Sequence, residues 1–300
     1  PRMRLRQIEV FHAVYSAGSV TSAANILHVS QPSVSKVLAH AEQQLGYALF
    51  ERSKGKLIPT PEAHRLFKHV STVYRDIDRL RHVAENLRLG DSGRVRIAGT
   101  PAFGLDVLPR AIASFRKEHE HALFEIETLH LDELNDALLE GRVDIGLAFE
   151  PLSSPGIEQQ SLATGRFVVL APADEDFGDK TSLKLGDIAD RPFIALNSRG
   201  PLGQSLSTHF ASSGVELNIV TWTETYHVAK ALVARGVGIT ITDEITARSG
   251  RPDDIQIFAL TPRLEYRINT LRLASEPLSV LGSNFIEHLK NSLRDFLRTP

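Results

Sequence analysis

Five residues that could contact DNA lie at the start of one amphipathic segment: Gln31, Pro32, Ser33, Ser35 and Lys36. A glutamine amide can pair with adenine, a lysine can reach guanine or phosphate, and serine hydroxyls can bond to either. The free amides at the N-terminus of a helix add affinity for phosphate. An ordinary capped surface helix would explain the same residues, so this segment alone leaves both interpretations open.

The flanking sequence predicts three short helices that would position these residues. Apolar residues recur at helical spacing over 4–16, Gly18 ends this first helix, and Ser19 is a suitable cap for the second. Ser30 is expected to cap the third helix, with Pro32 in its first turn, where the missing N–H costs nothing. The apolar stripe of the third helix would then face the other two helices and leave the candidate residues outside.

The stretch "YALFERSKGKLIPT", residues 47–60, predicts a β-hairpin whose tip carries Arg52, Lys54 and Lys56. A helix-turn-helix followed by a basic hairpin is a winged helix-turn-helix, in which the hairpin reaches a flanking groove or the backbone of DNA. Up to Thr60 there are seven Lys and Arg against three Asp and Glu, although the net charge of the whole chain is -2. This contrast favours a polyanionic partner for the first part only, with a solvated charged face as the alternative.

The motifs "GSVTSAANILHVSQPSVSK", "AEQQLG" and "LFER" resemble the DNA-binding domain of the LysR-type transcriptional regulators, and the resemblance covers that domain without a gap. It implies that the residues that meet DNA are Gln31, Pro32, Ser33, Ser35 and Lys36, with Arg52 on the wing. The sequence departs from the family at Lys36, where arginine is common, and at Ala63 and His64, where many members have Ala-Gly. The first departure bears on base preference, and the second on the entry to the next helix.

No helix breaker occurs between Pro61 and Leu89, and apolar residues there alternate in steps of four and three. This pattern predicts a dimerising coiled coil of about three heptads, which would bring two recognition helices to one side of a duplex. The alternative is a long helix packed on its own domain, which we disfavour because neither flank offers a nearby partner helix. The seam consists of Leu66, Val70, Val73, Ile77, Leu80, Ala84 and Leu87.

The second half alternates apolar strand patterns with helical patterns, which predicts α/β units with buried parallel strands. The expected fold class is therefore α/β, with a winged helix-turn-helix over 1–60, a linker helix over 61–90, and an effector-binding domain over 91–300. The family resemblance implies that this last domain has two lobes, as periplasmic binding proteins have. We expect lobe 1 over about 92–163 and 266–300, and lobe 2 over about 164–265.

Ligands of such sheets bind in the crevice beyond the carboxyl ends of the strands. The family resemblance implies that the hydroxyl residue after the first strand, here Thr100, contacts the effector. The candidates also have purely structural interpretations. In these, Thr100 and Asp243 would cap helices and His130 would be a surface loop residue. The candidate effector residues are Thr100, Pro101, Phe103, His130, Phe149, Asn197, Thr225 and Asp243.

The stretches "PFIALNSRGPLGQSL" and "ARGVGITITDEITA" resemble the branch of the family that senses opines, arginine, lysine or related amino acids. Such a ligand needs amides and hydroxyls for its carboxylate and a carboxylate for its ammonium group. Glu150, Glu224 and Asp243 are the candidates for the second role.

Other classes of function find little support in the sequence. The absence of cysteine excludes disulfides and thiol catalysis, and no apolar run approaches the roughly 18 to 20 residues of a membrane span. No Walker loop, GxGxxG fingerprint or nucleophile elbow is found, and His119 and His121 do not share a helical face that would favour a metal. With no export signal, a soluble cytoplasmic protein is expected.

We therefore predict a ligand-responsive transcription regulator without catalytic residues, metal or cofactor. Its expected partners are double-stranded operator DNA, a small-molecule effector, and further copies of the chain in a homodimer and homotetramer, with RNA polymerase as a candidate and no membrane. The rival interpretation is an enzyme or a transport-type binding protein that carries an accessory basic domain.

Overall fold

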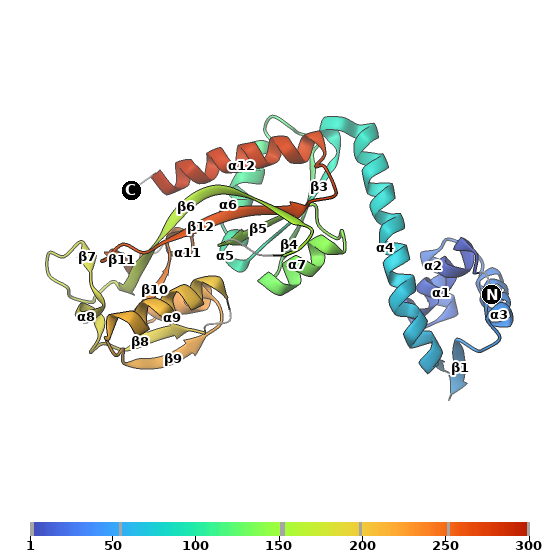
Figure 1. Cartoon of the computed structure of the whole chain (residues 1–300), viewed down its shortest axis with the longest axis horizontal. Coiled ribbons are helices and arrows are strands. Elements are labelled where there is room, and N and C mark those ends of the chain that lie inside the picture. Colours follow the sequence, from blue (N-terminus) through green and yellow to red (C-terminus); the bar gives the residue numbers. More distant parts are fainter. Residues whose placement is uncertain (1–2, 54–55, 151–153, 198–199, 251–252, 299–300) are drawn as a thin grey trace. The chain divides into compact units, whose positions relative to one another are not determined.

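The computed structural model describes residues 3–53, 56–150, 154–197, 200–250 and 253–298 (Figure 1). The chain divides into two compact units, residues 1–83 and 84–300. Lys54, at the predicted hairpin tip, lies outside the described residues. In the part of the chain that the structure describes, no helix has both the length and the apolar content needed to cross a bilayer.

The first unit contains the three predicted helices and the predicted hairpin. Gly18 ends α1 in the left-handed conformation (φ 68°), and the Ser19 hydroxyl caps α2 by accepting a hydrogen bond from the Ser22 amide. Ser30 has the predicted N-cap position of α3, but its hydroxyl bonds to the Ser33 hydroxyl rather than to the helix backbone. The elements are α1 (Leu5–Ala17), α2 (Val20–Ile26), α3 (Gln31–Leu45), β1 (Phe50–Ser53) and β2 (Lys56–Pro59), the two strands being antiparallel.

The long helix α4 (Pro61–Leu89) has the predicted range, but its first turns pack on their own unit. Leu66, Phe67 and Val70 join the core that α1, α2 and α3 form, and the Phe67 ring stacks on Tyr15 of α1 with 3.7 Å between centroids. The expectation that no partner helix lies nearby is therefore wrong for this part of α4. Further along the seam the apolar side chains are not covered by other described residues. Leu80, for example, is 69% exposed.

The second unit is built on a sheet whose strand order is β4-β3-β5-β12-β6-β11-β7, and β10 also pairs with β6. The expected parallel strands are found in β3, β4 and β5, and in a separate pair, β8 and β9. β7 and β11 also pair parallel, whereas β6 pairs antiparallel with β10, β11 and β12, and β12 pairs antiparallel with β5, which was not expected from the sequence. The bounds are β3 (Arg94–Gly99), β4 (Leu123–Thr128), β5 (Ile145–Phe149), β6 (Ile157–Pro172), β7 (Ser182–Leu183), β8 (Phe193–Leu196), β9 (Ile219–Thr223), β10 (Thr240–Asp243), β11 (Ile255–Leu260) and β12 (Glu265–Leu273).

The antiparallel pairing results from two long strands, β6 and β12, that connect the two parts of the sheet. Up to Arg166, β6 pairs with β12, whereas from Phe167 onward it pairs with β10 and β11. At this change Gly165 lies against the ring of Tyr266, and a Cβ atom on Gly165 would come within 2.5 Å of that ring. Glycine is therefore required for the close approach of the two strands.

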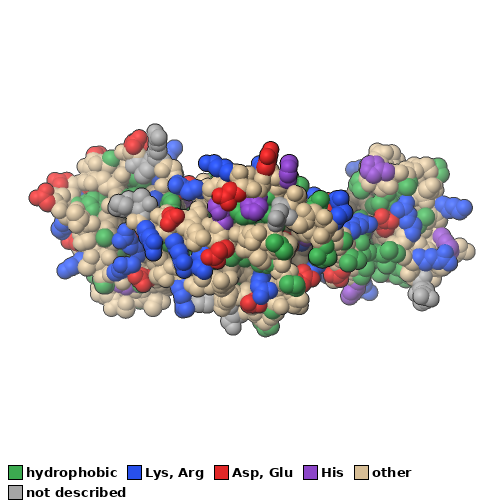
Figure 2. Space-filling model, turned by 90° about the horizontal axis from the view of Figure 1, so that it is seen from above, with side chains coloured by type: hydrophobic (Ala, Val, Ile, Leu, Met, Phe, Trp, Pro, Cys, Tyr) green, Lys and Arg blue, Asp and Glu red, His purple; other side chains and the backbone are tan. Residues whose placement is uncertain are grey.

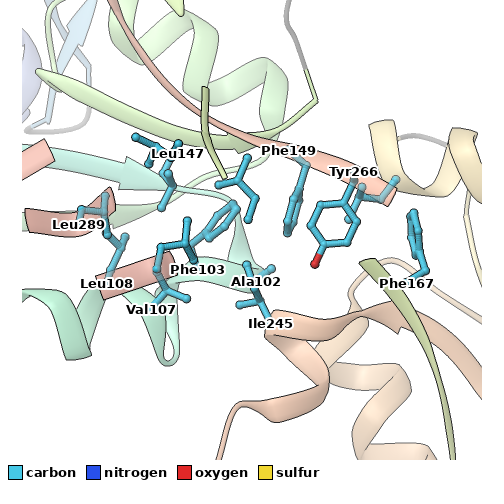
Figure 3. Close-up of a cluster of buried hydrophobic side chains, with 14 of the residues drawn as sticks. Ala102, Phe103, Val107, Leu108, Leu147, Phe149, Phe167, Ile245, Tyr266 and Leu289 are labelled. Atoms are coloured by element: carbon cyan, nitrogen blue, oxygen red, sulfur yellow. The ribbon is translucent and has the colours of Figure 1, made fainter. Parts of the chain in front are cut away.

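Helices cover the sheet and enclose an aromatic core (Figures 1 and 3). Tyr266 is 1% exposed, and its ring contacts Phe149 and Phe167 edge-on, with 5.0 and 5.3 Å between centroids. This core fixes β5, β6 and β12 to one another. The helices are α5 (Pro101–Gly104), α6 (Val107–Phe115), α7 (Leu131–Leu139), α8 (Leu185–Ile188), α9 (Pro201–Ser213), α10 (Tyr226–Val233), α11 (Glu244–Arg248) and α12 (Val280–Arg298), with a 3-10 turn at Gly90–Ser92.

Candidate nucleic-acid interface and ligand cleft

The tip of α3 presents the predicted DNA contacts together. Gln31, Pro32, Ser33 and Lys36 are exposed, and Ser35 is half-buried. Val34 and Leu38, on the opposite face of the helix, are buried in the core of the first unit and hold α3 in place. Two hydrogen bonds order the tip: Gln31 Nε2 donates to Ser35 Oγ at 3.0 Å, and the Ser30 and Ser33 hydroxyls are 2.9 Å apart. The geometry thus suits contact with base edges and phosphates.

The hairpin adds exposed cations beside this helix. Arg52 on β1 and Lys56 on β2 are both exposed. Glu42 of α3 connects the two elements, because its Oε1 accepts hydrogen bonds from the amides of Leu49 and Phe50 at 2.7 and 3.1 Å. Glu42 therefore positions the hairpin that carries Arg52, a role that the sequence analysis missed because it depends on a turn between helix and strand.

Six of the eight predicted effector residues line one cavity of about 110 Å³: Thr100, Pro101, His130, Phe149, Asn197 and Thr225. They lie at or just beyond the carboxyl ends of parallel strands. Gly99 of β3 is level with Thr128 of β4, and Leu196 of β8 is level with Thr223 of β9. Strand ends in register bring the following residues into one place, as the crevice rule expects. We call this cavity the cleft.

The structure places the other two predicted residues behind the cleft rather than in its lining. Phe103 is 0% exposed, and its ring lies 4.5 Å from that of Phe149 in the core. Asp243 is also 0% exposed, and its Oδ1 accepts a hydrogen bond from the Thr246 amide at the start of α11. Burial raises the pKa of Asp243 to about 6. The helix-capping interpretation therefore describes Asp243.

The three candidate carboxylates differ in their surroundings. Glu150 is bound to β12, because its Oε1 accepts from the Arg267 amide at 3.0 Å and its own amide donates to the Arg267 carbonyl. Glu224 lines the cleft, where Asn197 Nδ2 lies 3.4 Å from its Oε1. Of the three, Glu224 is therefore the carboxylate that a ligand in the cleft can reach.

The cleft also contains polar groups that suit an anion. Thr100 Oγ1 is buried and has no hydrogen-bond partner within the described residues, and Thr100 makes no side-chain bond to the helix α5 that follows it. The Tyr226 hydroxyl is likewise buried without a partner in the described structure. Burial, and then the charge of Lys230, lowers the pKa of the half-buried His227, which favours the neutral ring.

Tyr226 and His227 were not among the predicted site residues. Thr225 is the N-cap of α10, so the first turn of that helix faces the same cavity. Once Thr225 was chosen, the position of Tyr226 and His227 beside the cavity could have been inferred from the sequence. Across the described ranges, no three His, Asp or Glu side chains gather closely enough to hold a metal ion.

Comparison with known proteins agrees with both parts of this description. Residues 5–64 match the model of the bacterial regulatory helix-turn-helix protein, lysR family, and residues 88–294 match the LysR substrate binding domain. The HTH-type transcriptional regulator DgcR of Pseudoalteromonas sp is 40% identical over 291 residues, which cover 97% of this chain and 100% of that protein. The transcriptional activator protein LysR of Escherichia coli (strain K12) is 32% identical over 97% of this chain and 94% of its own length.

The fold agrees with the crystal structure of full-length CbnR complexed with its target DNA, with a TM-score of 0.72 and 24% identity over 97% of this chain and 100% of that one. The curated relatives named above are transcriptional regulators and not enzymes. The chain therefore belongs to the LysR family of DNA-binding transcriptional regulators, with an N-terminal helix-turn-helix domain and a C-terminal effector-binding domain.

Proposed function

We propose that this regulator reads operator DNA with the tip of α3 and the basic hairpin, and that a small amino acid bound in the cleft controls transcription. The DNA contacts are Gln31, Pro32, Ser33, Ser35 and Lys36 with Arg52 on the wing, as the family resemblance implies. The observation that carries the ligand proposal is the Thr100 hydroxyl, which is buried without a hydrogen-bond partner among the described residues, in a cleft that also presents Glu224.

The start of three helices at the cleft supports a carboxylate on the ligand. Leu131, Pro201 and Tyr226, the first residues of α7, α9 and α10, all line the cavity. The free amides and the positive dipole ends of helices stabilise an anion. Together with the Thr100 hydroxyl they would bind the carboxylate, while Glu224 would receive the ammonium group.

The composition of the lining distinguishes between the two ligand types that the sequence resemblance left open. Among the described residues, the lining contains neither lysine nor arginine. Among these described residues, a second carboxylate, as an opine carries, would meet no lysine or arginine. The described part of the lining therefore favours an amino acid with a single carboxylate over an opine.

Assembly follows from the uncovered part of α4. Leu80 is 69% exposed and Leu87 is 81% exposed, which is unusual for leucines in a regular heptad pattern. We propose that two copies pair along this stripe and that pairing of effector-binding domains gives a tetramer. Ligand binding would change the geometry of the paired domains and with it the spacing of the two α3 tips, the DNA bend and any contact with RNA polymerase.

Calorimetric titration of the full-length chain tests the ligand class. We expect saturable heat with a monocarboxylic amino acid, weaker binding in the Thr100→Val variant, and no binding of the matching amino acid amide. The proposal would be rejected if none of the twenty standard amino acids and none of the basic opines gave heat of binding. An electrophoretic mobility shift assay on DNA fragments that the protein selects from genomic DNA tests the proposed binding of operator DNA.

A further inference from the structure

A stack of aromatic rings joins α1 and α4 in the first unit. The ring of Phe67 on α4 is nearly parallel to those of two α1 residues, Tyr15 at 3.7 Å and His12 at 5.4 Å between centroids, with interplanar angles of 14° and 17°. The His12 ring in turn lies 4.1 Å from that of Tyr74 on α4, at an angle of 9°. We call Tyr15, Phe67, His12 and Tyr74 the ring stack.

The positions of the four rings along the two helices make them alternate. His12 and Tyr15 are three residues apart on α1, and Phe67 and Tyr74 are seven apart on α4, so each pair shares one face of its helix. Burial lowers the pKa of the half-buried His12, which favours the neutral ring. Because the neutral imidazole packs here as an aromatic ring, phenylalanine is a conservative replacement for it.

His64 adds a polar contact at the Tyr15 end of the ring stack. Its Nδ1 is hydrogen-bonded to the Tyr15 hydroxyl, and the two rings are perpendicular with 5.6 Å between centroids. The sequence departs from the family at this position, where many members have a glycine, and a glycine has no side chain to make this bond. The contact between α1 and α4 in this chain therefore includes a bond that the family resemblance does not imply.

The ring stack extends the contact of the first unit along α4. Ala63, Leu66 and Val70 attach the first turns of the helix to the core. Tyr74 lies one turn beyond Val70 and continues the contact toward Leu80, which is 69% exposed. Hydrophobic side chains gather at the surface of the part of the molecule that carries α4 (Figure 2). Along the helix, the ring stack thus connects the buried turns with the exposed ones.

The angle at which α4 leaves the core fixes where the tip of α3 lies relative to the exposed turns of α4. At 1.5 Å per residue, Leu80 lies about 30 Å along the helix from Pro61. A tilt of about 10° at the start of α4 would therefore move Leu80 by about 5 Å. One base pair of DNA rises by about 3.4 Å. A small tilt would thus change the separation of two paired tips by more than one base pair.

We propose that the ring stack determines which spacing of two half-sites this regulator accepts, with His12 and Tyr74 as positioning residues that act through α4. Two linked modules bind together only where their geometry fits both sites, so a fixed angle restricts the dimer to one spacing. A loose angle would let the two tips reach several spacings, with less affinity for the best one. This inference rests on the proposed pairing along α4 and on the proposed reading of DNA by α3.

Mobility-shift titrations at fixed salt test the proposal with a series of DNA fragments. Each fragment carries two copies of one half-site from the selected genomic DNA, and the spacer between them is changed by up to two base pairs in either direction. A change of one base pair shifts a half-site by about 3.4 Å and rotates it by about 35°. A fragment with a single half-site shows whether the reading surface itself is intact.

We expect the Kd of the original chain to rise at least tenfold at two base pairs from the best spacing. In the His12→Ala/Tyr74→Ala variant the same change should alter Kd by less than threefold, while the Kd for the single half-site stays within twofold of that of the original chain. His12→Phe and Tyr74→Phe keep the rings and should keep the tenfold discrimination. The matched control is His69→Ala, which should also keep it, because His69 is exposed on the same helix and lies outside the ring stack.

The proposal would be overturned if the double variant kept the tenfold discrimination, if it lost affinity for the single half-site as much as for the pair, or if His12→Phe behaved as the alanine variant does. An original chain without any spacing preference would also reject it. If circular dichroism showed that the double variant does not fold, Tyr74→Ala alone would provide the test, since Tyr74 is half-buried at the end of the ring stack.

The functions on which this inference rests fail in different measurements. The proposed reading of DNA fails if the original chain binds the single half-site no better than unrelated DNA. The proposed pairing along α4 fails if the mass of the Leu80→Asp variant is unaltered in the ultracentrifuge. The role of the ring stack is decided only by the comparison of variants across the spacer series.

Discussion

Replacing Thr100 by valine should stabilise the ligand-free protein and weaken effector binding at the same time. The Thr100 hydroxyl is buried and has no hydrogen-bond partner among the described residues. A buried polar group without a partner costs about 1–3 kcal/mol, and valine has almost the same shape. We expect the variant to gain about 1 kcal/mol, which corresponds to a rise in Tm of about 2–4 °C for a domain of this size.

The loss of affinity follows from the bond that the hydroxyl would make to the ligand carboxylate. A hydrogen bond to a charged group contributes about 1.5–3 kcal/mol, so Kd should rise roughly 10- to 150-fold. Differential scanning calorimetry and titration calorimetry on the same preparation measure both effects.

Thr240→Val is the matched control, because this threonine is also buried but its hydroxyl donates to the Ile194 carbonyl at 2.8 Å. Its replacement removes this buried hydrogen bond and should lower the stability by about 1 kcal/mol. If Thr100→Val lowered Tm as Thr240→Val does, or left the affinity for the amino acid unchanged, the role assigned to the Thr100 hydroxyl would be refuted.

Four further predictions concern other parts of the chain. Lys36→Ala should weaken operator binding and reduce the slope of log K against log salt by about 1 in mobility-shift titrations; an unchanged slope would remove its phosphate contact. Glu42→Ala should destabilise the first unit by about 1–3 kcal/mol in urea unfolding, because the amides of the hairpin lose their acceptor; no change would deny its positioning role. Leu80→Asp should lower the mass found by analytical ultracentrifugation, and an unaltered mass would exclude pairing along α4. Burial raises the pKa of Asp243 from 3.8 to about 6, so its charged form costs the folded state about 3 kcal/mol above pH 6 and little below pH 4. The free energy of unfolding of the Asp243→Asn variant should therefore increase relative to that of the original chain as the pH rises from 4 to 6. A difference between the two chains that does not depend on pH would contradict the assignment.

The elements of the first unit could be predicted because several of their boundaries have a local cause. Gly18 adopts a left-handed conformation that ends α1, and the Ser19 hydroxyl caps α2 through the Ser22 amide. Such causes lie within a few residues along the chain and are readable in the sequence. The packing of Phe67 on Tyr15 was missed because it joins residues that are distant in sequence, and the heptad pattern alone does not say what covers it.

The same distinction applies to the second unit. The cleft could be predicted in outline because parallel strands end at one edge, which places Thr100 beside His130. Phe103 and Asp243 were selected by the same rule, but the rule does not say which side chains near a strand end face the core, and both of these are fully buried there. The antiparallel course of β6 and β12 depends on pairing over about a hundred residues, and no local pattern indicates it.

Methylation-protection footprinting with dimethyl sulfate, which reports the guanine N7 atoms of the major groove, most directly tests the claim that paired α3 tips read operator DNA. With the original chain at fixed salt, we expect protection in two successive major grooves on one side of the duplex, and a loss of that protection in a Gln31→Ala/Ser33→Ala variant that still binds the amino acid. An identical footprint from this variant would contradict the assignment of the reading surface to the tip of α3.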